Sequence, residues 1–322
     1  MRTRKLGAGG PEITRIGLGT WAIGGSGWQY AWGPQDDNDS IAAIHRALDL
    51  GISWIDTAAV YGLGHSEEVV GRALVGRRQK VFLATKCART WDPGSSTIVD
   101  RLSAQSVRGE LEASLRRLKT DCIDLYQVHW PRPDEQIEEG WSEIARAVTE
   151  GKVRFAGVSN FNVPQLKRIM KIHPVTSLQP PYSMLRREAE KELLPFCREN
   201  GIGVIVYSPM QMGLLTGAFS RSRVTSLPGD DNRSRNPYFA EPALSRNLQL
   251  VEKLTPIARR AGRSMAELAI AWVLRRPEVT AAIVGGRKPA QVEQVVGGAE
   301  WDLSESEITQ VGELLAEREA LG

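Results

Sequence analysis

Short apolar runs alternate with amphipathic stretches along most of the chain. Residues 52–55 form a continuous apolar run that predicts a buried strand, and residues 80–86 predict another strand. Residues 40–50 and 98–118 carry apolar side chains at the three- and four-residue spacing of a helix with one buried face. Glycines such as Gly51 mark the change from helix to strand. The pattern therefore predicts an α/β protein built from repeated strand–helix units.

The number of these units favours a (β/α)8 TIM barrel. Eight units follow an N-terminal β-hairpin, whose second strand is predicted over residues 12–19, and this fits the ~250 residues of such a barrel plus additions. We expect the hairpin to cover one end of the barrel, a long polar loop at 216–246 after strand seven, and a single domain over residues 1–322. The alternative is a doubly wound open sheet. Each G-x-G start lacks the third glycine of the dinucleotide-binding fingerprint, so the barrel is the better prediction.

Composition and charge narrow the class of protein. Hydrophobic content of 42%, charged content of 25% and a net charge of +3 give no reason to expect nucleic acid or an acidic membrane as a partner. The N-terminus lacks the apolar core of a signal peptide, and no run approaches the ~20 apolar residues of a membrane span. The three cysteines share no CxxC spacing, which favours reduced thiols and a cytoplasmic location. No histidine pair has metal-ligand spacing, so we expect no metal site.

Polar residues recur at the predicted strand ends. Asp56, Lys86 and His129 lie at the ends of three consecutive strands, and Tyr61 follows Asp56 by five residues in a glycine-bounded loop. Because the C-terminal ends of all barrel strands face one mouth, these side chains should share a pocket. Later strand ends add Ser159, Asn160, Gln179 and Tyr207. Taken singly, Asp56 could be a helix cap and Tyr61 a packing aromatic; together the four residue types indicate a reactive site.

The acid, phenol, ammonium and imidazole suit the reduction of a carbonyl group, whose oxygen needs a proton as hydride reaches the carbon. A tyrosine near its reference pKa of about 10 is a weak acid at neutral pH. We expect Lys86 to favour the phenolate and so make Tyr61 a better proton donor. Asp56 would pair with Lys86, and His129 would hydrogen-bond the carbonyl oxygen.

Several motifs resemble the aldo-keto reductases over nearly the whole chain, from GLGTW to GGRKPAQ. The family motifs are IDTAAVYG, FLATK with Lys86, LYQVHW, GVSN and QPPY. Two further motifs, HSEEVVG and YQVHWPRP, look closest to the bacterial general-stress-protein type of the family. The resemblance implies a (β/α)8 barrel that reduces aldehydes and ketones to alcohols with NADPH and needs no metal. It leaves the carbonyl substrate and the oligomeric state open.

The resemblance also implies roles for individual residues. Tyr61 would be the general acid, and Asp56, Lys86 and His129 would support it. The residues implied to contact the cofactor are Gly19, Thr20, Trp21, Asp56, Ser159, Asn160, Gln179, Tyr207, Ser208, Pro209, Met210, Gln211, Met212, Gly213, Leu214, Gly285, Gly286, Arg287, Lys288 and Gln291. Many family members carry Glu-Asn where this chain has Gln294-Val295, a departure at the adenine contacts.

Two other functions compete with the reductase. One is an NADPH-binding regulatory or redox-sensing subunit with marginal turnover, although no segment resembles a docking element. The other is a barrel aldolase that uses Lys86 to form a Schiff base. Steady-state NADPH oxidation separates the first alternative from a reductase, and borohydride trapping of a covalent adduct separates the second.

Overall fold

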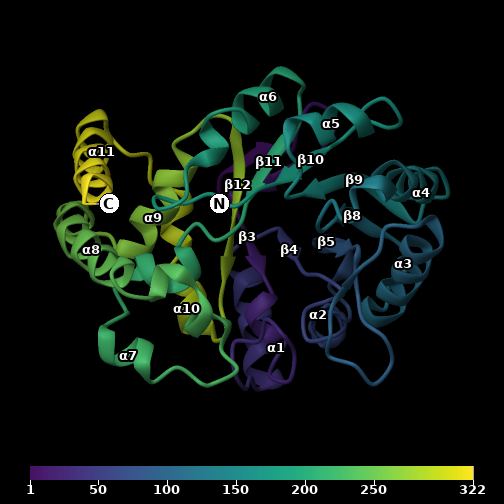
Figure 1. The fold of residues 1–322 in the computed structure, drawn as a ribbon, viewed down its shortest axis with the longest axis horizontal. Helices are drawn as coiled ribbons and strands as arrows, with labels where there is room; N and C mark the ends of the chain where they lie inside the picture. The colour runs from purple at the N-terminus through teal and green to yellow at the C-terminus, as the bar shows by residue number, and fades with distance from the viewer. Residues whose placement is uncertain (322) are drawn as a thin grey trace.

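The computed structural model describes residues 1–321 and confirms the predicted barrel. Eight parallel strands close in the order β10-β11-β12-β3-β4-β5-β8-β9 (Figure 1). The barrel strands are β3 (Ile16–Gly19), β4 (Trp54–Asp56), β5 (Phe82–Cys87), β8 (Ile123–Val128), β9 (Val153–Ser159), β10 (Ser177–Gln179), β11 (Gly203–Val206) and β12 (Val279–Gly285).

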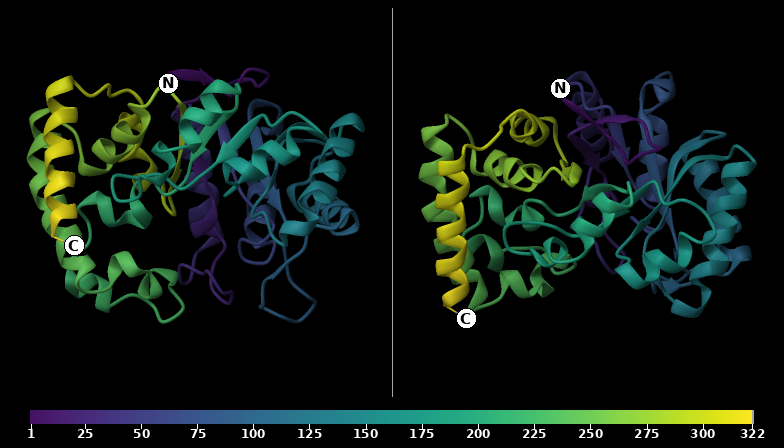
Figure 2. Two further views of the ribbon diagram at one scale, coloured as in Figure 1. Left: turned by 45° about the horizontal axis from the view of Figure 1, so that its top comes forward. Right: turned by 90° about the horizontal axis from the view of Figure 1, so that it is seen from above.

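The helices lie outside the barrel, and α11 packs along α8 at one side of the molecule (Figures 1 and 2). They are α1 (Asp37–Asp49), α2 (His65–Ala73), α3 (Ala104–Leu118), α4 (Ile137–Thr149), α5 (Val163–Ile169), α6 (Leu193–Glu199), α7 (Arg221–Thr225), α8 (Ala243–Arg260), α9 (Met265–Leu274), α10 (Pro289–Glu293) and α11 (Glu305–Ala320). Local sequence explains several starts: Asp36 accepts the first free N–H groups of α1, and Ser264 and Glu267 form a capping box at α9. Within residues 1–321, no helix has the length and apolarity needed to cross a membrane.

The N-terminal hairpin covers one end of the barrel, as predicted, but its second strand is shorter. β1 (Thr3–Lys5) pairs antiparallel with β2 (Glu12–Thr14), and the predicted strand 12–19 is interrupted at Arg15. The residues after Arg15 form β3, the first barrel strand. Leu6 and Ile13 of the hairpin belong to the apolar cluster inside the barrel. The hairpin therefore closes the interior at the N-terminal ends of the strands.

Buried apolar side chains form two main clusters because successive strand residues face opposite sides of the barrel wall. Trp54, Leu125 and Ile205 belong to the interior cluster. Their chain neighbours Ile55 and Tyr126 belong to the larger cluster, which includes the buried faces of the helices. This alternation decides which strand residues face the barrel interior.

Two long connections project from the C-terminal ends of the strands, toward the lower side of Figure 1. The first carries a small hairpin of β6 (Arg89–Thr90) and β7 (Val99–Asp100) between β5 and α3. The predicted helix over 98–118 was therefore wrong at its start, since the helix begins only at Ala104, after the capping side chain of Ser103. The second connection follows β11 and contains α7, so the predicted loop 216–246 is long but includes short helices.

Candidate active site

Strand alternation places a polar layer above the apolar interior. Asp56 lies two residues after Trp54 on β4, and Gln127 lies two residues after Leu125 on β8. Lys86 on β5 is the register partner of Gln127, and Gln179 on β10 is that of Ser159. Because side chains two residues apart share a face of a strand, all these groups point into the barrel near its C-terminal mouth.

Lys86 holds the centre of this layer. Its Nζ donates to Asp56 Oδ2 at 2.5 Å, to the Thr57 carbonyl at 2.9 Å and to Tyr61 Oη at 3.4 Å. An ammonium group has three N–H donors, so all of them have partners here. The structure thus brings together three of the four predicted catalytic residues through direct contacts.

Two glutamines hold the far side of the Asp56 carboxylate. Gln179 Nε2 donates to Asp56 Oδ1 at 2.9 Å, and Gln127 Nε2 donates to the same oxygen at 3.3 Å. Sequence reasoning assigned Gln179 to the cofactor and missed Gln127. The signal for Gln127 was an amide two residues after Leu125, at the spacing that faces the interior, and the structure shows it fully buried.

His129 follows β8 and completes the group. Its ring lies edge-on to the Tyr61 ring, with centroids 5.7 Å apart. Burial lowers the pKa of His129 well below its ordinary value, and the charges of Lys86 and Arg89 lower it further. The imidazole is therefore neutral at physiological pH and can donate one hydrogen bond and accept another. Its Nδ1 has no hydrogen-bond partner within residues 1–321.

The structure corrects the expected effect of Lys86 on Tyr61. Burial raises the pKa of the Tyr61 phenol well above its ordinary value, the Asp56 charge raises it further, and Arg89 opposes them. Lys86 is hydrogen-bonded to the phenol but does not bring a net lowering of this pKa. Burial also lowers the pKa of Lys86 against the opposing effect of Asp56. The phenol therefore remains protonated at neutral pH and available as a proton donor.

A cavity of about 600 Å³ opens above this layer, a size typical of ligand sites. Most of the predicted cofactor residues line it. They are Gly19, Thr20, Trp21, Asp56, Ser159, Asn160, Gln179, Tyr207, Ser208, Pro209, Met210, Met212, Gly213, Gly285, Gly286, Arg287 and Gln291. Gln294 and Val295, at the sequence departure, line it as well.

Three predicted cofactor residues lie away from the cavity wall. Leu214 is fully buried in an apolar cluster, and Gln211 Oε1 accepts a hydrogen bond from Ser183. Lys288 Nζ lies 3.3 Å from Asp39 Oδ2 and does not line the cavity. Arg287, its neighbour, does line the cavity.

Asn160 and Tyr207 form a hydrogen-bonded wall on one side of the cavity. Asn160 adopts a left-handed backbone conformation, with φ of 63°, and its amide donates to the His129 carbonyl at 3.0 Å. The Tyr207 hydroxyl donates to Asn160 Oδ1 at 2.9 Å, and burial raises the pKa of Tyr207 to about 12. Ser159 Oγ donates to the Gln179 carbonyl at 2.8 Å. These contacts fix side chains that the family resemblance assigns to the cofactor.

Arg233 and Arg287 also line the cavity. Arg287 donates to the carbonyls of Trp32 and Pro34 and to Gln35, so it holds the segment 32–35 against the barrel. The positive charge of Arg233 contributes to lowering the pKa of Arg287, after burial. Sequence reasoning missed Arg233, because it lies in the connection after β11. Neighbouring cations in one cavity favour an anionic ligand such as a phosphate.

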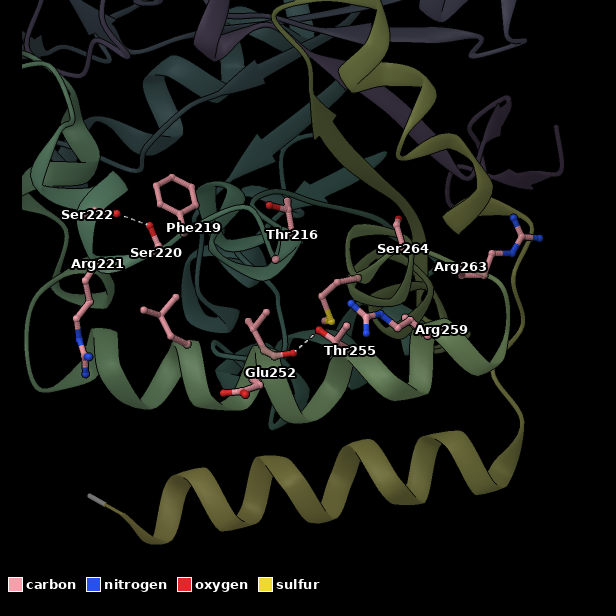
Figure 3. A pocket seen from close by; sticks show the side chains of 15 residues that line it. Thr216, Phe219, Ser220, Arg221, Ser222, Glu252, Thr255, Arg259, Arg263 and Ser264 are labelled. Carbon is pink, nitrogen blue, oxygen red and sulfur yellow. Dashed lines mark hydrogen bonds between the residues drawn. The ribbon is translucent and has the colours of Figure 1, made fainter.

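A second cavity of about 700 Å³ lies between α8 and the segment 216–222 (Figure 3). It shares Thr216, Phe219 and Ser264 with the central cavity. None of the predicted catalytic residues borders it. The segment 216–222 is therefore a wall between two cavities. Within residues 1–321, no group of three or more His, Cys, Asp or Glu side chains is arranged to hold a metal ion.

The fold and this site agree with the comparisons to known proteins. The model of the Aldo/keto reductase family matches residues 15–316, so the chain belongs to that family and is an oxidoreductase of the aldo-keto reductase type. The resemblance read from the sequence is thereby confirmed.

Particular relatives are similar over nearly their whole length. The chain is 40% identical to aldo-keto reductase YhdN of Bacillus subtilis, over 95% of this chain and 91% of that protein. It is 35% identical to the NADH-specific methylglyoxal reductase of Escherichia coli, over 98% of each. Among solved structures, the glycerol dehydrogenase AKR11B4 from Gluconobacter oxydans superposes with a TM-score of 0.86 at 38% identity, covering 98% of this chain and 95% of that one.

Proposed function

We propose that the protein reduces aldehydes and ketones to alcohols, with NADPH as hydride donor and Tyr61 as general acid. The observation that carries the proposal is the contact of Lys86 Nζ with both Asp56 and Tyr61 at the floor of the cavity. When bound, NADPH supplies the hydride. The protein's own residues then have to hold the carbonyl and deliver a proton to its oxygen.

Tyr61 and His129 suit these two tasks. The Tyr61 phenol is protonated at neutral pH, and its oxygen accepts a hydrogen bond from Lys86, which stabilises negative charge left on that oxygen. Neutral His129 can donate a hydrogen bond to the same carbonyl oxygen, since its ring lies beside Tyr61. Asp56 keeps Lys86 charged and in place, and Gln127 and Gln179 keep Asp56 in place.

The residues of the cavity fit a dinucleotide phosphate. Gly285 and Gly286 end β12 at the cavity wall, where the absence of side chains lets a ligand approach the backbone. Arg233 and Arg287 supply positive charge at this end. One relative is named NADH-specific, so NADPH is proposed here from the arginines of this chain, which suit the additional 2′-phosphate.

The contacts of Lys86 also favour a reductase over an aldolase. A Schiff-base lysine attacks a carbonyl carbon with a free amine, whereas all three donors of Lys86 have partners.

NADPH absorbance during incubation with a panel of aldehydes and ketones tests the proposal. We expect oxidation of NADPH in step with alcohol formation and no borohydride-trapped adduct on Lys86. Binding of NADPH without turnover of any carbonyl would instead support a regulatory subunit, and a trapped adduct would support an aldolase.

A further inference from the structure

Arg89 lines the central cavity and has no part in the proposed proton transfer. It begins β6, three residues after Lys86. Between them, Ala88 adopts a left-handed backbone conformation, with φ of 79°, and its N–H donates to both oxygens of the Glu110 carboxyl at 3.0 and 3.2 Å. A non-glycine residue persists in this conformation only when its surroundings hold it. The fold therefore fixes the direction in which Arg89 leaves the end of β5.

The Arg89 guanidinium makes few hydrogen bonds for its five donors. Nη2 donates to the Tyr30 hydroxyl at 3.1 Å, and the guanidinium carbon lies 4.8 Å from the centre of the Tyr30 ring. Nε lies 3.4 Å from Asp100 Oδ1, but neither atom has a hydrogen-bond partner in the described part of the chain. Within residues 1–321 the hydrogen bond from Nη2 is the one that the guanidinium makes. Asp100 does not line the cavity, so it approaches Arg89 from the side away from the cavity.

Two of the other cavity arginines are engaged more completely. Arg233 binds the buried carboxylate of Asp231 through Nε and Nη2. Arg287 uses all three of its nitrogens to hold the segment 32–35. Arg223 donates from Nη1 to the Ala218 carbonyl and lies over the Phe219 ring, so it also has donors left. Of these two arginines, Arg89 is the one whose charge acts on Tyr61 and His129.

Arg89 lies on the same side of the cavity as the proposed proton donor. Its charge lowers the pKa of both Tyr61 and His129, in the first case against the larger effect of burial. Uncharged aromatic residues form the wall between them: the Trp28 ring centre lies 6.2 Å from that of Tyr61 and 6.0 Å from that of Tyr30. A small molecule with its carbonyl at Tyr61 would therefore extend along an aromatic wall toward a guanidinium.

We propose that Arg89 binds an anionic group of the substrate, a carboxylate or a phosphate, at the end remote from the carbonyl. The inference rests on the proposed carbonyl reduction and names its substrate class: short aldehydes and ketones that carry a negative charge. The planar guanidinium can donate two parallel hydrogen bonds to either group. The Trp28 ring would pack against the carbon chain between the two ends of the substrate.

Two other roles for Arg89 make different predictions. As an anchor for Tyr30 it would support the loop 22–33, and as a nearby cation it would alter the acidity of Tyr61. Either effect changes the turnover of charged and neutral carbonyl compounds alike. Only direct binding of an anion changes the ratio between them.

The test compares matched substrate pairs with the full-length protein and NADPH. Succinic semialdehyde and its next longer homologue are each paired with their methyl esters, and glyceraldehyde 3-phosphate is paired with glyceraldehyde. We expect kcat/KM to be higher for the charged member of at least one pair, and the preferred pair distinguishes a carboxylate from a phosphate. In Arg89→Met the charged-to-neutral ratio of kcat/KM should fall by about tenfold to 150-fold, mainly through KM. Arg89→Lys should retain part of the charged-to-neutral ratio of kcat/KM, because lysine keeps the positive charge but cannot donate two parallel hydrogen bonds.

Tyr30→Phe is the matched control, since it removes the hydroxyl contact and leaves the guanidinium. Its charged-to-neutral ratio should remain near that of the unaltered protein. Equal kcat/KM values within every pair, or an equal fall for both members in Arg89→Met, would overturn the anion site. Failure of every substrate to oxidise NADPH, neutral ones included, would instead overturn the proposed reduction itself.

Discussion

At the N-terminal end of the barrel interior, Trp54 and Leu125 pack with Ile13 of the hairpin in an apolar cluster. Two residues further along the same strands, Asp56 and Gln127 are buried just as deeply but belong to a hydrogen-bonded network. One end is stabilised by removing apolar surface from water. The other must offset the desolvation of Lys86 and Asp56, because buried charges destabilise a fold unless they are paired and hydrogen-bonded.

The difference shows what each end contributes. The apolar end needs only shape: the backbone of Gly17 lies so close to the Trp54 ring that an added Cβ would come within 2.1 Å of it. The polar end needs particular atoms at particular distances, such as Lys86 Nζ between Asp56 and Tyr61. Substitutions at the first end should therefore alter stability, and substitutions at the second end should alter turnover.

The largest expected effect is that of Tyr61→Phe. Loss of the hydroxyl removes the proposed proton donor, and positioned proton transfer typically contributes about 10²- to 10⁴-fold to a rate. We expect kcat to fall by that factor, while the dissociation constant for NADPH and the thermal unfolding midpoint remain close to those of the unaltered protein. Activity within about tenfold of the unaltered protein would place the proton donor elsewhere.

Trp54→Ala should lower the stability of the fold and leave turnover largely intact, the reverse of Tyr61→Phe. Truncating a large, fully buried aromatic side chain typically destabilises a protein by about 3–5 kcal/mol, and the indole also loses its hydrogen bond to the Thr14 carbonyl. Urea unfolding should show the loss, with turnover per folded molecule largely retained at low temperature. Trp54→Phe serves as the milder control. If Trp54→Ala unfolded at the same urea concentration as the unaltered protein but turned over substrate more slowly, the apolar end would not act through stability alone.

Arg287→Ala tests the proposed binding of the NADPH 2′-phosphate by Arg287. Hydrogen bonds to charged groups contribute about 1.5–3 kcal/mol, so NADPH affinity should weaken by roughly tenfold to 150-fold while NADH affinity changes little. Lys288→Ala is the control, because Lys288 pairs with Asp39 and does not line the cavity. Equal weakening of both cofactors would mean that Arg287 acts only by holding the segment 32–35. Equilibrium fluorescence titrations with each cofactor measure both affinities.

A pH-dependent prediction concerns Glu110, whose carboxyl accepts hydrogen bonds from the Ala88 N–H at the end of β5. Burial raises the pKa of Glu110 to about 8, against an ordinary value of 4.5. Its protonation stabilises the folded chain fully below about pH 4.5, and this contribution is lost as pH rises through about 8. We expect the unfolding midpoint of Glu110→Gln to rise relative to that of the unaltered protein between pH 5 and pH 9. A constant difference across this range would contradict the raised pKa.

The sequence predicted the strands and their polar ends well, because short apolar runs and the glycines that follow helices are local signals. Asp56, Lys86 and His129 could be placed at one mouth before any coordinates were known, since a barrel brings strand ends together. Gln127 carried a signal that was overlooked. No sequence signal marked Arg89. The strands β6 and β7 have only two residues each, and β7, which pairs Asp100 with Arg89, lies in a segment whose sequence predicted a helix.

The pKa shifts of the buried site residues could not be predicted from residue types either. Lys86 was expected to lower the pKa of Tyr61, but burial and Asp56 dominate once the side chains are placed. The contacts of Arg287 with the segment 32–35 join parts of the chain more than two hundred and fifty residues apart. Such pairings depend on the closed barrel, which brings β12 beside β3.

We propose that this cavity promotes hydride transfer from NADPH to a carbonyl carbon while Tyr61 protonates the oxygen. Incubating the protein with an aldehyde and NADPH deuterated at the transferring position, then analysing the alcohol by mass spectrometry, tests it directly. We predict one deuterium on the carbinol carbon with the unaltered protein and with Trp54→Phe, and almost no labelled alcohol with Tyr61→Phe. Unlabelled alcohol from the unaltered protein, or undiminished labelling with Tyr61→Phe, would contradict the account.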